Sequence, residues 1–185
     1  MLVYENFPSF FDTLNTNIPE SSNKIPDILD EVLYNLRWML TMQDEDGGLY
    51  HKLTNPNFDG YIMPDKATEP RYVVMKTTAA SLDFAAVTAV AYRIFKKFNK
   101  ALPGLADSCL AASLKAWKWA KENPEVKFVQ GKMNATYNPD VVTGAYDDNN
   151  LKDEFQWAAI ELYIATLKYS FYTEMNLQFT LNNSF

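Results

Sequence analysis

The sequence predicts an all-α domain, built of αα-hairpins that are joined by long loops. Apolar residues recur at helical spacing in four segments, and clusters of Pro, Gly, Asn and Asp separate these segments. No segment alternates apolar and polar residues over the length of an ordinary strand. With 185 residues and 48% apolar content, the chain can bury a core of its own. We therefore expect a single domain over residues 1–185.

The first predicted helix runs from Asp27 to Met42, where one broad stripe of apolar residues lies at helical spacing. Pro26 suits its first turn, because the N–H that proline lacks is not needed there. Gly47 and Gly48 end this segment. A connection rich in Pro, Asn and Asp then runs from Asp44 to Met75 without periodicity. Loops of this length in compact domains are usually functional.

Three further helices are predicted. Lys76 to Lys97 is apolar around nearly its whole circumference, so other helices must surround it. Leu105 to Lys121 carries one apolar face. Asp153 to Leu167 is the last strong helix, with Asp153 expected as its N-cap and Glu154 in its first turn, where the helix dipole favours a carboxylate.

Composition excludes several classes of function. A net charge of -6, without a run of Lys or Arg, argues against binding to nucleic acid or to an anionic membrane. No stretch is expected to span a membrane, and the first residues do not form a signal peptide.

The single cysteine, Cys109, is expected to be a buried thiol. The single histidine, His51, has no neighbours that suggest a nucleophilic or zinc site.

Four phrases in this order carry a family resemblance: NIPESSNKIPDILDEV at 17–32, DGGLYHKLT at 46–54, EPRYVVMKTTAASLDFAAV at 69–87 and AYDDNNLKDEFQWAAIELYIAT at 145–166. Together they resemble the middle of a family 9 glycoside hydrolase. The resemblance covers about Phe7 to Leu167 and implies part of an (α/α)6 barrel, a toroid of six hairpins. Residues 169–185 depart from the family pattern, and are read either as a frayed helix or as vector- or frameshift-derived sequence.

The resemblance implies an inverting β-1,4-glucanase that acts on cellulose or a related β-glucan. Neither the Asp-Ala-Gly-Asp motif nor the Asn-Glu motif, which carry the family's catalytic carboxylates, occurs in the chain. The chain is therefore expected to be an internal, inactive fragment of a catalytic domain from a secreted parent. The alternative is a non-catalytic α-helical module that binds a glucan or a protein.

Five residues are candidates for contact with the glucan: His51, Arg71, Tyr72, Tyr146 and Asp148. Aromatic faces stack on sugar C–H surfaces and polar groups bond to hydroxyls, so a Pro-stiffened loop with Arg71 and Tyr72 suits a cleft wall. The resemblance places the other three in loops that face the cleft. For His51 the alternative is a hydrogen bond to the backbone, and for Arg71 an ion pair with Glu69 or Asp65.

A calcium site is predicted from the segment that precedes the last helix. Its candidate ligands are Asn149, Asn150, Asp153 and Glu154, because Ca²⁺ prefers oxygen ligands in flexible geometry. The resemblance implies a structural Ca²⁺ at the Asp153-Glu154 pair. The equally weighted alternative is a cluster of N-cap and Asx-turn contacts.

Two expectations concern surfaces. A part of a toroid exposes inner helices that normally have neighbours, so a homo-oligomer or a swapped dimer is expected. The four tryptophans are expected to pack between helices rather than to bind sugar: Trp38, Trp117, Trp119 and Trp157.

Overall fold

The structure is a computed structural model that describes residues 1–182, with side chains as far as Met175. The helices are α1 (Leu2–Asn6), α2 (Pro8–Phe11), α3 (Asp27–Thr41), α4 (Thr78–Phe95), α5 (Leu105–Glu122), α6 (Gln130–Asn134), α7 (Lys152–Thr166) and α8 (Tyr169–Asn182). Short 3-10 turns lie at η1 (Pro64–Lys66) and η2 (Lys96–Phe98), and two short strands at β1 (Leu53–Thr54) and β2 (Tyr72–Val73).

The four predicted helices are confirmed as α3, α4, α5 and α7, with ends that shift by no more than two residues. The predicted N-cap of α7 is wrong. Leu151 occupies that position and Asp153 is the second residue of the helix. Asp153 and Glu154 both lie in the first turn, where the positive end of the helix dipole favours a carboxylate.

Two strands interrupt the long connection between α3 and α4, although the sequence predicts none. β1 pairs antiparallel with β2, with Leu53 opposite Val73 and Thr54 opposite Tyr72. A strand of two residues cannot show the alternation that marks a half-buried strand, so periodicity gives no sign of it. The strands hold the two ends of the long loop together.

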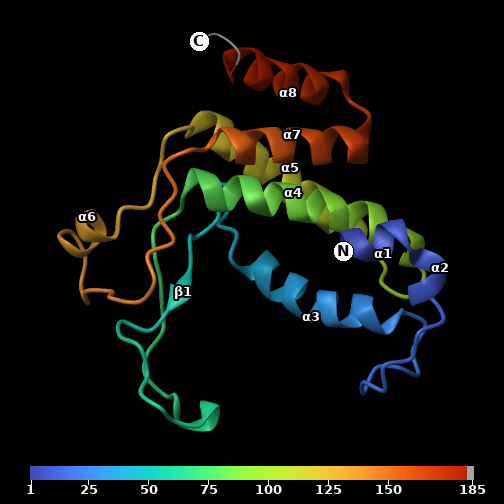
Figure 1. The fold of residues 1–185 in the computed structure, drawn as a ribbon, viewed down its shortest axis with the longest axis horizontal. Coiled ribbons are helices and arrows are strands. Elements are labelled where there is room, and N and C mark those ends of the chain that lie inside the picture. Colours follow the sequence, from blue (N-terminus) through green and yellow to red (C-terminus); the bar gives the residue numbers. More distant parts are fainter. Residues whose placement is uncertain (183–185) are drawn as a thin grey trace.

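Helix α4 lies at the centre of the core, as its apolar circumference predicts. In Figure 1 it lies between α3 on one side and α7 and α8 on the other, with α5 behind. Leu82, Phe84 and Ala85 are fully buried, and Ser113 of α5 donates a hydrogen bond of 2.6 Å to the carbonyl of Ala85. Cys109 is buried, as predicted.

The segment Thr78–Phe98 is long and apolar enough to cross a membrane by length and composition alone, contrary to the prediction that no stretch would be. Two thirds of the tested window are buried inside the protein (67%). A central core helix passes the same test, because it too must be apolar all round.

Helix α8 occupies most of residues 169–185, the segment that the sequence was expected to show as a departure from the family pattern. Phe171 is buried against Leu162 of α7, and its ring makes an edge contact with Trp117, 5.8 Å between centroids. The helical interpretation of this segment holds as far as Asn182. Residues 183–185 lie outside the described residues.

Apolar side chains are exposed on α3, where Tyr34 is almost fully accessible and Trp38 is 47% accessible. Such a face is suited to association. The homo-oligomer or swapped dimer stays a prediction.

Candidate functional site

The long loops gather at the end of the fold where α4 and α7 begin (Figure 1). Three segments form one layer there. β1 pairs with β2, while Val142 donates a 2.8 Å hydrogen bond to the carbonyl of Pro56. The hydroxyls of Thr54 and Thr143 are 2.7 Å apart. Residues about 90 positions apart in sequence are thus fixed beside one another.

A cavity of about 480 Å³ opens in this layer. Three aromatic side chains at its edge are well exposed: Trp38 (47%), Phe58 (74%) and Tyr146 (76%). The other lining residues are Lys52, Leu53, Thr54, Asn55, Asn57, Asp59, Arg71, Thr143 and Gly144. Exposed rings beside hydroxyl, amide and charged groups can bind the apolar face and the hydroxyls of one ligand together.

Lys52 ties the cavity to the loop before α7. Its ammonium group donates hydrogen bonds to the carbonyl of Gly144 and, at 3.3 Å, to the hydroxyl of Thr143. The same nitrogen lies 5.7 Å from the centre of the Tyr146 ring, within the range of a cation–π contact. Burial lowers the pKa of Lys52, and the charge of Asp147 opposes this shift.

Tyr146 has a backbone conformation that non-glycine residues seldom adopt, with a φ of 58°. A side chain at Gly144 would meet this ring, because a Cβ there would lie 3.0 to 3.1 Å from its atoms. Strained backbone of this kind concentrates at functional sites. The backbone conformation of Tyr146 and the contact with Lys52 thus hold its ring at the edge of the cavity. Glycine at position 144 leaves the space that the ring occupies.

His51 lies beneath this edge, with both ring nitrogens in use. Nδ1 is 3.0 Å from the hydroxyl of Thr77, the N-cap of α4, and Nε2 is 3.3 Å from the carbonyl of Ala145. The ring stacks on Phe128 with centroids 4.3 Å apart. Burial lowers the pKa of His51 and so favours the neutral ring. A carbonyl can only accept a hydrogen bond, so Nε2 donates to Ala145 and Nδ1 accepts from Thr77. His51 therefore links α4 to the loop that carries Tyr146.

The five residues predicted to contact glucan do not all lie at one cavity. Arg71 and Tyr146 line the same cavity, whereas Tyr72 lines a second one. Among the described residues Arg71 has no ion pair, and Asp65 pairs with Lys66 instead, at 3.0 Å. The fifth candidate, Asp148, lies in a cluster of carboxylates. Trp38, which the sequence analysis assigned to packing between helices, lines the cavity.

The cluster of carboxylates consists of Asp83, Asp148, Asp153 and Glu154. Burial, the hydrogen bond with Asp148 and nearby negative charge raise the pKa of Glu154 to about 7. Burial and the charges of Asp148 and Asp153 raise the pKa of Asp83 to about 6. One oxygen of Glu154, Oε2, is buried without a hydrogen-bond partner. Asp83 was not predicted as a site residue, although a lone carboxylate in so apolar a helix is a usable signal.

The other two predicted calcium ligands make local contacts. Asn150 N–H donates to Asp148 at 2.8 Å, which is an Asx turn, and its side chain donates to Asp153 at 2.9 Å. Lys127 donates to the carbonyl of Asn149 at 2.9 Å. Within residues 1–175, no three acidic, His or Cys side chains form a group that could hold a metal ion. Asx-turn contacts, the alternative to calcium, are therefore present, and the calcium site stays a prediction.

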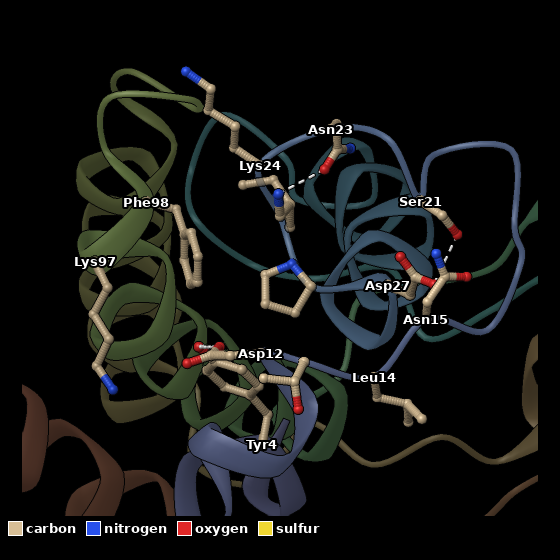
Figure 2. Close-up of a pocket in the computed structure, with 13 residues that line it drawn as sticks. Tyr4, Asp12, Leu14, Asn15, Ser21, Asn23, Lys24, Asp27, Lys97 and Phe98 are labelled. Carbon is tan, nitrogen blue, oxygen red and sulfur yellow. Dashed lines mark hydrogen bonds between the residues drawn. The ribbon is translucent and has the colours of Figure 1, made fainter.

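A further cavity, of about 540 Å³, lies at the opposite end of the helices (Figures 1 and 2). Its carboxylates already accept hydrogen bonds from neighbouring residues. Tyr4 donates to Asp12 at 2.9 Å, and Asp27 accepts hydrogen bonds from Thr16 and Ser21. Figure 2 shows Lys24 extending away from these groups, whereas the ammonium group of Lys97 lies 5.9 Å from the centre of the Tyr4 ring. We assign this cavity a structural role at the start of α3.

Comparison with known proteins agrees with this architecture. The profile of "Glycosyl hydrolase family 9" matches residues 1–184. The xyloglucan-specific endo-beta-1,4-glucanase BoGH9A of Bacteroides ovatus is 48% identical over 167 residues, which are 90% of this chain and 28% of that protein. Endoglucanase D of Acetivibrio thermocellus is 35% identical over 88% of this chain and 25% of its own. A solved Bacteroides ovatus GH9 structure superposes with a TM-score of 0.93 at 46% identity, over 95% of this chain and 32% of its own.

The fold and the loop layer are those of a helical-barrel glycoside hydrolase. The chain belongs to glycosyl hydrolase family 9, and its helices are part of that family's (α/α)6 barrel. It spans between a quarter and a third of the length of the relatives named above.

Proposed function

We propose that this protein is part of a β-1,4-glucanase and that its loop layer forms one wall of the glucan cleft. The observation that carries the proposal is the cavity with Trp38, Phe58 and Tyr146 exposed beside Lys52 and Arg71. Named relatives are glucanases, one of them specific for xyloglucan. A neutral, ring-rich polymer is the ligand that such a mixture of rings and hydrogen-bonding groups suits.

Hydrolysis with inversion takes an acid and a base roughly 6.5 to 9.5 Å apart, so that water fits between them. We propose that neither catalytic carboxylate lies within these 185 residues. The pure chain is then expected to release no reducing sugar from carboxymethylcellulose or xyloglucan. Hydrolysis that disappears in Asp83→Asn would instead place the acid in the carboxylate cluster and contradict the proposal. Glucan binding without hydrolysis favours the alternative, a binding module, unless added flanking sequence restores activity.

Tyr146→Ala is expected to weaken binding of a soluble β-glucan oligosaccharide by about tenfold or more, roughly 1.4 kcal/mol. The ring is well exposed, so its loss removes contact with the ligand and little of the core. Gly144→Ala is expected to weaken binding in the same direction with Tyr146 still present, because the new methyl group displaces the ring. Isothermal titration with cellotetraose and with a xyloglucan heptasaccharide measures both effects.

Tyr34→Ala is the matched control for these variants, since Tyr34 is also exposed but lies on α3 outside the cavity. Unchanged affinity is expected. Equal losses in Tyr34→Ala and Tyr146→Ala, or no loss in Tyr146→Ala, would remove Tyr146 from the glucan cleft.

We also propose that Ca²⁺ binds at the start of α7, with Glu154 and Asp153 as carboxylate ligands and Asn149 and Asn150 adding oxygen ligands from the preceding loop. The buried, unpartnered oxygen of Glu154 and the raised pKa of its carboxyl group suit a site where a cation replaces a proton. When bound, Ca²⁺ would offset the charge of the cluster and fix the loop before α7.

This proposal predicts a pH-dependent effect of calcium on stability. The pKa values of Asp83 and Glu154 rise from about 4 in the unfolded chain to about 6 and 7, so these groups lower the free energy of unfolding as pH rises through that interval. Ca²⁺ at a hundredfold excess over its Kd should restore about 2.7 kcal/mol, or roughly 5 to 11 °C in Tm. We expect this gain at pH 7.5 and little of it at pH 5.

Thermal unfolding in EDTA and in Ca²⁺, at both pH values, is the measurement. Carboxylates whose pKa is lowered, such as Asp44, make the free energy of unfolding rise with pH instead. The test is therefore the difference in calcium response between wild type and Glu154→Gln. Glu154→Gln should lose the calcium response, whereas the exposed Glu122→Gln should retain it. A response that survives in Glu154→Gln would contradict the proposed site.

A further inference from the structure

A second cavity, of about 290 Å³, lies between β2 and α6. Tyr50, Tyr72 and Tyr137 line it, together with Met75, Met133 and Val141. Arg71 and Tyr72 are neighbours in the chain. Arg71 lines the glucan cavity, whereas Tyr72, the first residue of β2, lines this one.

The chemistry of the lining defines the ligand. No lining residue is charged, so an ionic ligand would lose its water without gaining a counter-ion. The hydroxyls of the three tyrosines make no hydrogen bond to any described residue, and Tyr137 is largely exposed. Tyrosine combines a flat apolar face with a hydroxyl, the two features that hold a neutral sugar ring. The volume is at the lower end of the range for small-molecule sites, which fits one ring rather than a chain.

We propose that this cavity, which we call the tyrosine pocket, is a second carbohydrate site for a single neutral sugar ring, separate from the glucan cavity. The segment from Pro139 to Tyr146 connects the two, because Pro139 and Val141 line the tyrosine pocket whereas Thr143 and Tyr146 line the glucan cavity. A branch or an end of a glucan is the natural source of such a ring. The site stands on its own lining residues, and does not depend on where hydrolysis takes place.

The test is titration of the protein with methyl β-glucoside and with xylose, followed by NMR, with glucuronate as a charged probe. Millimolar binding of a neutral sugar is expected, with glucuronate bound at least tenfold more weakly. Tyr137→Ala should reduce neutral-sugar affinity at least tenfold, and Tyr72→Phe should reduce it less, because the ring remains. Tyr61→Ala, which removes a fully exposed tyrosine elsewhere in the loop, should have no effect.

Tyr146→Ala separates this site from the glucan cavity. Sugar binding that persists in Tyr146→Ala and is lost in Tyr137→Ala supports the tyrosine pocket, even if cellotetraose does not bind at all. Absence of sugar binding, equal binding in Tyr137→Ala, or loss only in Tyr146→Ala would overturn it. Binding of p-cresol without binding of either sugar would also overturn it, since the pocket would then be a site for aromatic compounds.

Discussion

Arg93→Ala is expected to lower the free energy of unfolding by about 3 to 5 kcal/mol, or roughly 6 to 20 °C in Tm. Arg93 on α4 is 13% exposed and donates to Glu161 of α7, 8% exposed, at 2.8 Å. It also donates to Glu5 of α1 at 2.9 Å. Its removal leaves the Glu161 carboxylate buried without its cation, because the other side-chain donor to it within residues 1–175 is the neutral Trp157. Chemical denaturation measures the loss.

Two further variants distinguish this mechanism from simple loss of packing. Lys118→Ala removes one member of an exposed pair with Glu122, 3.7 Å apart, and should change stability by no more than about 1 kcal/mol. Glu161→Gln in the Arg93→Ala background should recover part of the loss, because the unpaired charge is gone. No recovery would show that the cost comes from the arginine's packing and not from a buried charge.

Gly48→Ala is expected to cost about 1 to 3 kcal/mol, because the site leaves no space for a methyl group. A Cβ at Gly48 would lie 2.6 Å from the nearest ring atom of Trp119. Trp119 is buried and donates a 3.0 Å hydrogen bond to Asp46, which also accepts from Lys76. A displaced ring therefore disturbs the turn that leads into the loop layer.

A double-mutant cycle tests this steric explanation. In a Trp119→Leu background the bulky ring is absent, so adding Gly48→Ala should cost much less than it does in wild type. Thermal unfolding of the four proteins gives the coupling energy. Equal costs in both backgrounds would contradict the contact with Trp119 as the cause of the loss.

The helical part of the fold could be predicted because periodicity is strong in long helices. The apolar circumference of α4 indicated a central helix, and Phe84 and Ala85 are indeed fully buried. The short strands could not be predicted, because β1 and β2 are only two residues long and depend on pairing with each other. The N-cap of α7 was misplaced because Asp153 has a strong capping preference and Leu151 has none.

The candidate site was predicted only in part, since it is assembled from distant segments. Arg71 and Tyr146 were named from local sequence, and the structure brings them together. Trp38 was assigned to packing because it lies within a helix, yet its exposure depends on which helices cover α3. Asp83 was not predicted, although it is the one carboxylate in the apolar helix α4. Its proximity to Asp148 follows from the contact between α4 and the loop before α7, which sequence spacing does not reveal.

Hydrogen–deuterium exchange of this protein, with and without a xyloglucan heptasaccharide, tests directly whether the loop layer binds glucan. The glycan is expected to slow exchange in residues 52–59, 71–73 and 143–147, which form the loop layer. Exchange in α5 and at the α1 and α2 end should not change. Protection confined to that opposite end, or no protection at saturating glycan, would contradict the assignment of the loop layer as a glucan-binding wall.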